Sequence, residues 1–376
     1  MKGHIQQRGK NSYRLKFDAG RDEKTGERQT QFVTFRGSKR QAQIKLAELI
    51  TAVDQSRYVE ASKITVADFV RSRVDLWEAA GEISARTSAR YRELVENQIA
   101  PHLGARPLQK LRTIDIETWH TTLRNSGRAD GKGGLSPRTI GHAHRVLGKA
   151  LRDATKNEMV VKNVVSAQSA PKVDVEEMAI IKDVPAFVEQ IRGKRLFVPA
   201  MTSLFTGLRL GEVLALRWGR IDLDRNVIQV REALEETKLY GIRFKTPKSK
   251  AGRRDVTLPD ILVEALREFR KEQLELRLKL GIGKLQEDTL LFAGIDGALP
   301  SQKRYSKAWS NFYPAATFHG LRHTHASQLI DAGVDIVTIS KRLGHAKPSI
   351  TLAIYAHLFQ KDDGKAAAAI NAMLPR

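Results

Sequence analysis

Cysteine is absent from the 376 residues of this sequence, aromatic residues make up only 6%, and no long apolar run occurs. Without thiols the chain has no disulfides and no thiolate ligands for a metal. A membrane-spanning helix needs ~20 consecutive apolar residues. The amino-terminal stretch M-K-G-H-I-Q-Q-R lacks the apolar centre of a signal peptide. These absences predict a cytoplasmic protein.

Acidic residues are scarce relative to basic ones. The chain holds 64 lysines and arginines against 42 aspartates and glutamates, so its formal net charge is +22 and its pI is about 10.2. Residues 1–60, 61–170 and 171–376 are each positive, at +6, +7 and +9. Solubility alone is one explanation. A protein that contacts a polyanion along its whole length explains the spread better, and such binding weakens as salt rises.

Residues 1–60 are expected to form a small β-sheet and one helix. Tyr13, Leu15 and Phe17 alternate with Arg14 and Lys16, which is typical of a strand with one apolar and one basic face. The remaining signals are a turn at 23–26, a second strand at 31–35, a capping box at Ser38 and Gln41, and a helical stripe of Ala42, Leu46, Leu49 and Val53.

Residues 64–165 are expected to form an all-helical, basic domain. Four helices are predicted. The first begins near Thr65 and Asp68, the second covers 88–99 and ends at Pro101, the third covers 113–123, and the fourth begins at Ser136 with Pro137 in its first turn. The stretch 166–177 has no periodicity and contains Pro171. It is therefore predicted to be an interdomain linker.

Residues 178–362 are expected to mix helices with two strand pairs. An apolar helix at 196–205 ends at Gly207, and Arg209 opens a new helix in which Glu212 can orient it. The predicted strand pairs are 221–223 with 227–230 and 242–246 with 254–258, followed by a helix at 260–280. The loop at 247–253 is basic, so Lys248, Lys250 and Arg253 are candidate phosphate contacts.

The strongest chemical signal lies between residues 319 and 357, which hold five of the ten histidines: 319, 323, 325, 345 and 357. His319 and Arg322 are three residues apart at an expected helix start, so both can face one anion. His345 follows a helix that Gly344 ends, and Tyr355 lies on a further short helix. Guanidinium binds phosphate oxygens bidentately, and a tyrosine beside it can be a nucleophile.

Two other classes of protein compete at this point. A metal-dependent hydrolase would use the H-x-x-x-H spacing of 319 and 323, but the cluster lacks paired carboxylates. A DNA-binding regulator without catalysis would explain the charge but not the combination of arginine, histidine and tyrosine.

The motifs resemble those of the tyrosine recombinases, the phage-integrase family. The resemblance is carried by T-G-L-R-L-G-E at 206–212, H-G-L-R-H-T-H-A-S at 319–327, L-G-H at 343–345 and I-Y-A-H-L at 354–358. It implies a multidomain, mainly α-helical protein with small sheets. The implied parts are an arm-binding module at 1–60, a core-binding domain at 64–165 that clamps DNA together with the catalytic domain, an α+β catalytic domain at 178–362, and a tail helix at 363–376 that docks on a neighbouring subunit.

The same resemblance implies the chemistry. Tyr355 attacks a scissile phosphate, leaving a 3′-phosphotyrosyl link and a free 5′-hydroxyl, with no metal or other cofactor. The implied roles are charge stabilisation for Arg209 and Arg322, base for His319, phosphate hydrogen bonding for His345, and general acid for Lys245, with Lys248 and Lys250 as alternatives. His323, His325, His357, Glu212 and Trp218 are expected to be structural.

The implied function is integration and excision of a temperate phage or integrative element in a bacterial host, at the nucleoid. The implied partners are double-stranded attachment-site DNA, three further copies in a homotetramer, an excisionase and a host DNA-bending protein. A chromosome-dimer resolving recombinase is the alternative, but it normally lacks a sheet module like that of residues 1–60. Two departures stand out: Gly320 replaces an aspartate common in the family, and the interval from Trp309 to His319 is short and contains Pro314.

Overall fold

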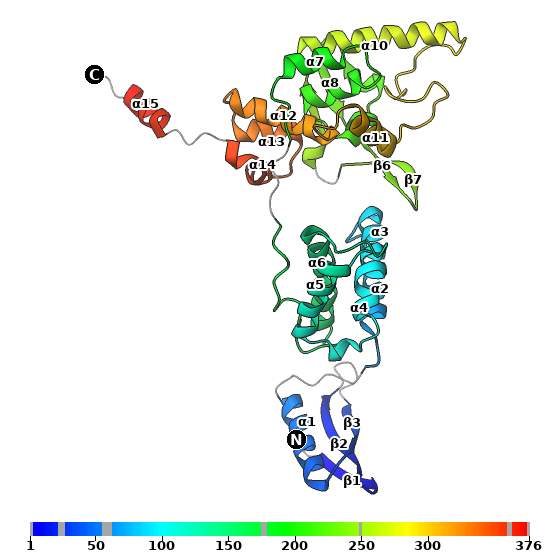
Figure 1. The fold of residues 1–376 in the computed structure, drawn as a ribbon, viewed down its shortest axis with the longest axis vertical. Helices are drawn as coiled ribbons and strands as arrows, with labels where there is room; N and C mark the ends of the chain where they lie inside the picture. The colour runs from blue at the N-terminus through cyan, green and yellow to red at the C-terminus, as the bar shows by residue number, and fades with distance from the viewer. Residues whose placement is uncertain are drawn as a thin grey trace. The chain divides into compact units, whose positions relative to one another are not determined.

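The computed structural model describes residues 3–21, 27–54, 62–173, 179–247, 250–358 and 363–373. The chain divides into two compact units, Met1–Val175 and Glu176–Arg376, and each is described by itself. The described residues are mainly helical with small antiparallel sheets, as predicted (Figure 1). None of the helices in these ranges is long and apolar enough to cross a membrane.

The amino-terminal sheet has three antiparallel strands in the order β1-β2-β3, covered by helix α1. Their bounds are β1 Gly3–Gly9, β2 Ser12–Arg21, β3 Arg28–Arg36 and α1 Lys39–Asp54. The capping box at the start of α1 is formed, because the Gln41 side chain accepts from the Ser38 amide at 2.9 Å. Strand β1 was not evident from the residue pattern, and the turn expected at 23–26 lies outside the described residues.

The two faces of this sheet differ as the alternation predicts. Tyr13, Leu15 and Phe17 are buried in one small core with Ala42 and Leu46 of α1. The intervening basic side chains of β2 therefore lie on the opposite face.

The helical part of the first unit has a core of its own. Its elements are α2 Val66–Ala79, α3 Ala85–Leu94, the π-helical turn η1 Val95–Ile99, α4 Ala100–Leu103, the 3₁₀ turn η2 Leu108–Lys110, α5 Thr113–Ser126 and α6 Pro137–Lys156. The predicted caps are confirmed, since the hydroxyls of Thr65 and Ser136 accept from the amides of Asp68 and Thr139.

One helix end predicted here is wrong. The helix expected to stop before Pro101 continues through it to Leu103. In the preceding π turn the Ala100 amide bonds to the Val95 carbonyl, five residues back. This wider turn accommodates the proline ring, which in a regular helix collides with the carbonyl four residues earlier.

The second unit packs helices around two small sheets. Its helices are α7 Val184–Ile191, α8 Phe197–Thr206, α9 Leu210–Leu214, α10 Asp260–Lys279, α11 Gln302–Phe312, α12 Phe318–Asp331, α13 Ile336–Leu343, α14 Pro348–Tyr355 and α15 Asp363–Met373, with 3₁₀ turns η3 Trp218–Arg220, η4 Lys250–Gly252 and η5 Ala356–Leu358. Helices α12, α13 and α14 lie next to one another (Figure 1). The indole of Trp309 is fully buried and donates to the Ala316 carbonyl at 2.7 Å, which fixes the short path into α12.

The strand pairing in this unit differs from the prediction. Strands β4 Ile221–Asp222 and β5 Val227–Val230 pair as expected. However, β7 Gly241–Lys245 pairs with β6 Ala233–Thr237, whereas β8 Arg254–Thr257 pairs with β5. Strand β6 immediately follows β5 and was missed, because its Leu-Glu-Glu-Thr sequence has no clear alternation. The basic loop therefore connects two sheets and does not close a hairpin.

The π turn generates a stability prediction. The Trp119 indole of α5 donates to the Gln98 carbonyl at 2.7 Å, inside the π turn. Replacing Trp119 by Phe leaves that carbonyl without this donor, which is expected to cost about 1–3 kcal/mol. Hydrogen exchange of the whole protein should show faster exchange for the amides of α4 and unchanged exchange for α8, which belongs to the other unit. Equal protection in α4 would contradict this role for the indole.

Candidate active site and basic surfaces

Arg209 is positioned by the turn between α8 and α9. Helix α8 ends at Gly207, whose φ of 69° favours glycine. Arg209 is then the N-cap of α9, and Glu212 accepts from its backbone amide and from its Nη1, each at 3.0 Å. The orienting role expected for Glu212 is thus present. The Arg209 side chain stays 42% exposed and can reach a ligand.

Arg322 joins the two motif regions. It lies in the first turns of α12 and is 2% exposed. Its Nη1 donates to the Gly207 carbonyl at 2.5 Å, and its Nη2 lies 2.8 Å from Nε2 of His345. Burial lowers the pKa of Arg322, with Arg209 adding to the effect, but a guanidinium stays charged at neutral pH. Both hydrogen-bond partners are uncharged groups, so the positive charge is open to an anion.

His345 is fixed between α12 and α14. Gly344, with φ 69°, ends α13 and turns the chain so that His345 faces Arg322. A side chain at 344 would meet the Arg254 guanidinium at 2.6 Å, which is a second reason for glycine. Nδ1 of His345 lies 2.7 Å from the Thr351 hydroxyl. Burial, followed by the charge of Arg322, lowers the pKa of His345 to about 4, so the ring is neutral at pH 7.

Tyr355 ends α14 and is 1% exposed. Its hydroxyl lies 2.6 Å from Nδ1 of His323. Burial raises the pKa of Tyr355 to about 12, although Arg322 and Arg209 oppose the shift. Attack by this oxygen therefore requires a base. His323, which was expected to be structural, is the histidine that contacts the hydroxyl.

His319 sits one turn before His323 on α12 and is exposed. The two rings meet edge to face, with centroids 4.6 Å apart. The α12 helix thus offers one histidine to the surface and the next to the tyrosine. The sequence pattern alone does not show which of these two histidines contacts Tyr355.

Lys245 is the last residue of β7. Its Nζ bonds to Oε1 of Glu235 at 2.9 Å, and Arg243 holds the other oxygen of the same carboxylate. Burial raises the pKa of Glu235, but Lys245 and Arg243 outweigh it, and the pKa ends below its usual value. The candidate general acid is thus held in an ion pair with a buried carboxylate.

The other candidate phosphate contacts lie on the segment between β7 and β8. Lys250 and Arg253 are exposed on and after η4. Lys248 lies outside the described residues.

Arg254 is a site residue that the sequence reasoning missed. It is 9% exposed, its Nη2 bonds to Glu212 at 3.0 Å, and its Nε donates to the Arg342 carbonyl at 2.7 Å. It therefore ties β8 to α13 and shares Glu212 with Arg209. The sequence did carry a signal, because Arg254 is two residues before Val256 and four before Leu258, which places it on the same buried face of the strand.

Several residues that were expected to be structural make contacts within the fold, away from Tyr355. Nε2 of His325 accepts from Nε of Arg342 at 3.0 Å, away from the tyrosine. The buried Trp218 indole donates to Gln273 at 2.9 Å. A side chain at Gly320 would meet the Ala179 carbonyl at 2.9 Å, so an aspartate here would require segment 179–181 to shift. The side chain of His357 is not among those that the structure describes.

The solvent face of the amino-terminal sheet is basic and carries one exposed aromatic ring. The Arg14 guanidinium lies 4.1 Å from the centroid of Phe32, and Lys16 Nζ lies 5.9 Å from it. Phe32 is 48% exposed. Two cations are thus held close to one ring.

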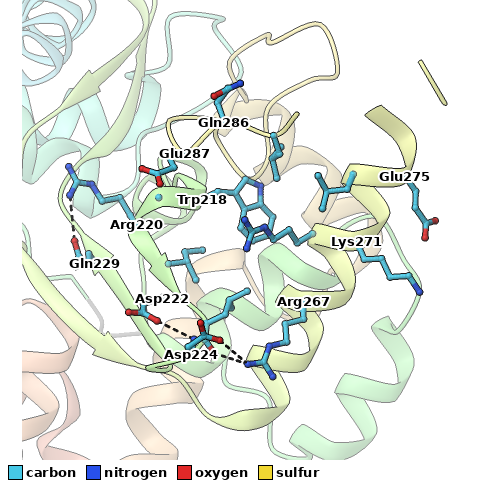
Figure 2. A pocket seen from close by; sticks show the side chains of 16 residues that line it. Trp218, Arg220, Asp222, Asp224, Gln229, Arg267, Lys271, Glu275, Gln286 and Glu287 are labelled. Atoms are coloured by element: carbon cyan, nitrogen blue, oxygen red, sulfur yellow. Dashed lines mark hydrogen bonds and ion pairs between the residues drawn. The ribbon is translucent and has the colours of Figure 1, made fainter. Parts of the chain in front are cut away.

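The cleft of about 730 Å³ in Figure 2 lies in the second unit. It opens between α10 and the η3–β5 region, and its charged lining is Arg220, Arg267, Arg270 and Lys271 with Asp222, Asp224, Glu275 and Glu287. The six candidate catalytic residues do not line it. Within the ranges that the structure describes, no group of three or more histidines and carboxylates is arranged to hold a metal ion.

Comparison with known proteins agrees with this geometry. The model of the phage integrase family matches residues 178–362, and that of the phage integrase N-terminal SAM-like domain matches residues 70–124. Among solved structures, the Tn1549 transposon integrase in complex with a circular intermediate DNA has a TM-score of 0.69 and 20% identity, over 83% of this chain and 100% of that one. The lambda integrase tetramer bound to a Holliday junction has a TM-score of 0.53 and 18% identity, over 92% and 96%.

Relatives in sequence cover nearly the whole chain. A tyrosine recombinase XerC-like protein of Caldanaerobacter subterraneus subsp. tengcongensis is 25% identical over 96% of both chains. The ICEBs1 integrase of Bacillus subtilis is 27% identical over 76% of this chain and 78% of its own. The fold is that of the integrases. The chain belongs to the phage integrase family of tyrosine recombinases.

The shared carboxylate of Glu212 generates a second prediction. Replacing Arg254 by Met leaves Glu212 with half of its positive partners, and breaking a buried pair in this way is expected to cost about 3–5 kcal/mol in unfolding free energy. Denaturation of the whole protein, followed by hydrogen exchange of α9 and α13, measures this cost. The double variant Arg254→Met, Glu212→Gln should regain part of it, because no charge is then stranded.

The pH dependence of this cost has a definite sign. Burial raises the pKa of Glu212, but Arg254 and Arg209 together outweigh it, and the folded pKa lies below the ordinary 4.5. The pair therefore stabilises the fold above pH 4.5 and loses that effect as pH falls through the folded pKa. The stability difference between wild type and Arg254→Met should shrink in acid. A difference that grows in acid would contradict the pairing.

Proposed function

We propose that this protein is the integrase of a temperate phage or integrative element, a site-specific recombinase that cuts and rejoins DNA through a 3′-phosphotyrosyl intermediate. The observation that carries the proposal is the buried Arg322 guanidinium, whose bonding partners are uncharged and which connects the turn before Arg209 with His345. A charge buried in this way favours an anion as its ligand. Tyr355 lies at the end of α14, which packs beside α13 next to this arginine's helix.

In this proposal Arg209, Arg322 and His345 bind the scissile phosphate. The negative charge on its nonbridging oxygens grows in the transition state, and donors fixed in advance stabilise that charge. Exposed His319 at the amino-terminal end of α12 adds a donor that the phosphate can reach, or a base as the family resemblance implies.

Tyr355 is the nucleophile. Its oxygen forms a bond to phosphorus while the bond to the 5′-oxygen breaks, and the 5′-hydroxyl of the exchange partner later reverses the step. One phosphodiester replaces another, so the energy of the bond is kept and the proposed reaction uses no nucleotide or other cofactor.

Lys245 is proposed to protonate the leaving 5′-oxygen. The ion pair with Glu235 is made by an ammonium group, which carries a proton of the kind that a general acid gives up. It also holds the side chain on the hairpin, so the hairpin has to release Lys245 before cleavage. Lys250 remains an alternative acid because it is exposed nearby in sequence.

The remaining parts are proposed to bind DNA and further copies of the chain. Residues 1–60 would bind arm-type sites through the face of Arg14, Lys16 and Phe32, and 64–165 would clamp the core site after a linker at 166–177. Lys248, Lys250 and Arg253 would contact phosphates. The tail helix within 363–376 would dock on a neighbouring copy, as the family resemblance implies. The proposed assembly is a tetramer, which is the form of the lambda integrase bound to a Holliday junction. An excisionase and a host DNA-bending protein complete the proposed partners, at the bacterial nucleoid.

Two alternatives make different predictions. A chromosome-dimer resolving recombinase would cleave and recombine DNA without any requirement for residues 1–60. A regulator without catalysis would bind the same DNA and form no covalent link.

Covalent trapping tests the proposed chemistry. The protein is incubated in EDTA with duplex DNA from the ends of its element, nicked near the crossover, and then denatured. Wild type is expected to form a protein–DNA adduct and Tyr355→Phe none. An adduct in the variant would mean that another residue is the nucleophile, and tight binding without any adduct in wild type would favour the regulator.

The same assay tests Lys245. Lys245→Ala is expected to slow cleavage by about 10²–10⁴-fold, the usual contribution of a general acid. DNA with sulfur as the bridging 5′ atom has a leaving group that needs no proton, so it should restore the rate. Failure of this substrate to restore the rate would indicate that Lys245 acts in another way.

The arm-binding role generates a prediction about binding. Arg14→Ala with Lys16→Ala should weaken binding to arm-type DNA and make its salt dependence shallower, by a slope of about 0.9 for each phosphate that the variant no longer neutralises. Cleavage of the core site should not change. The matched control is Lys45→Ala, on the helix that covers the other side of the sheet. Unchanged arm binding in the double variant would contradict the assignment.

A further inference from the structure

The nucleophile has an unexpected partner. His323 is 9% exposed, lies on α12, and places Nδ1 2.6 Å from the Tyr355 hydroxyl. This distance is within the range of a direct hydrogen bond between a hydroxyl and a ring nitrogen. The hydroxyl donates to Nδ1 when the ring proton is on Nε2.

We propose that His323 is a catalytic residue that accepts the proton of the Tyr355 hydroxyl during cleavage and returns it during rejoining. The inference rests on the proposed function and assigns the base in it to a definite atom. His319 then serves the phosphate side, where its exposure places it.

Geometry separates the two histidines. A general base must lie within hydrogen-bonding reach of the proton that it takes. Nδ1 of His323 meets this condition, whereas His319 presents its ring to the edge of His323, with centroids 4.6 Å apart, and is exposed on its other side. The rings of His323 and Tyr355 are themselves 5.6 Å apart and tilted by 59°, so they touch at their polar edges and are not stacked.

The charges around His323 keep it neutral before DNA binds. It faces His319 and Arg322 on its own helix, His345 from the segment after α13, and Tyr355 from α14. Burial, then His319, Arg322 and His345, lower its pKa to about 4. Neutral imidazole is the form that can take a proton. A phosphate held by Arg322 counters the positive charge of the site, which raises the proton affinity of His323 when the substrate is in place.

The protons and bonds balance in each step. In cleavage, the O–H bond of Tyr355 breaks, its proton moves to Nδ1 of His323, the tyrosyl oxygen bonds to phosphorus, and the leaving 5′-oxygen takes a proton from Lys245. In rejoining, the 5′-hydroxyl returns its proton to Lys245 and attacks phosphorus. The tyrosyl oxygen leaves and takes back the proton from His323.

The test variant is His323→Asn. The Asn side-chain amide can still hydrogen bond to the tyrosine from nearly the position of Nδ1, but it does not titrate. Single-turnover cleavage is measured with saturating protein on nicked DNA whose bridging 5′ atom is sulfur, which removes the need for Lys245. At pH 7 the variant is expected to be about 10²–10⁴-fold slower than wild type, with unchanged DNA affinity.

The pH profile separates a base from a structural partner. Wild type should vary little in rate between pH 7 and 9, because a neutral base is already present. His323→Asn should rise about tenfold per pH unit, because its rate follows the ionised fraction of a tyrosine whose pKa lies above this range. His102→Asn, an exposed histidine on α4, is the matched control and should follow wild type.

The possible outcomes are distinct. A slow variant with a steep pH profile would support the proposal. A variant as fast as wild type, or slow with a flat profile, would overturn it while the wild-type adduct still supported the proposed function. A wild type that forms no adduct would overturn both. If His323→Asn does not melt cooperatively, His323→Gln is measured in the same way.

Discussion

The catalytic cluster depends on the placement of one buried guanidinium. The Arg322 side chain is almost completely buried, and its hydrogen-bond partners are the Gly207 carbonyl oxygen and a ring nitrogen of His345. Because both partners are neutral, the fold holds a positive charge that it does not neutralise, and a phosphate can complete it. The left-handed turns at Gly207 and Gly344 are what bring these partners to the arginine.

The same enclosure determines how protons are handled. A cluster rich in arginine and shielded from water keeps imidazoles neutral and keeps the tyrosine protonated, so no group in it is ionised in advance for attack. The Tyr355 hydroxyl, the proposed nucleophile, is hydrogen bonded to His323. The proposed acid and base lie on separate elements, because Lys245 is engaged with Glu235 on the β6–β7 hairpin, whereas the histidines belong to α12 and the segment after α13.

Much of this could be predicted from the sequence, and the failures have physical causes. Helix starts and stops are set by local signals, so the positions of Arg209, Arg322, His345 and Tyr355 on their elements followed from caps and glycines. Strand pairing is not local, and β7 and β8 were paired wrongly because adjacency in sequence was taken for adjacency in the sheet. The partner of Tyr355 depends on how α14 docks on α12. His319 and His323 are one helical turn apart, so the sequence pattern is the same for both. Only the packing of the helices determines that His323 is the one that contacts Tyr355.

The ion pair on the hairpin also restricts how the chain can vary in length. Lys245 lies diagonally from Glu235, and Arg243 lies directly opposite it, so all three side chains share one face of a two-stranded ribbon. Side chains alternate between faces along a strand. One residue inserted within β7 would turn the lysine to the opposite face, whereas changes at the tip, 238–240, leave the register of both strands intact. Changes in the length of the hairpin are therefore expected to be tolerated at that tip, where they alter its reach without moving Lys245, the proposed acid, to the other face.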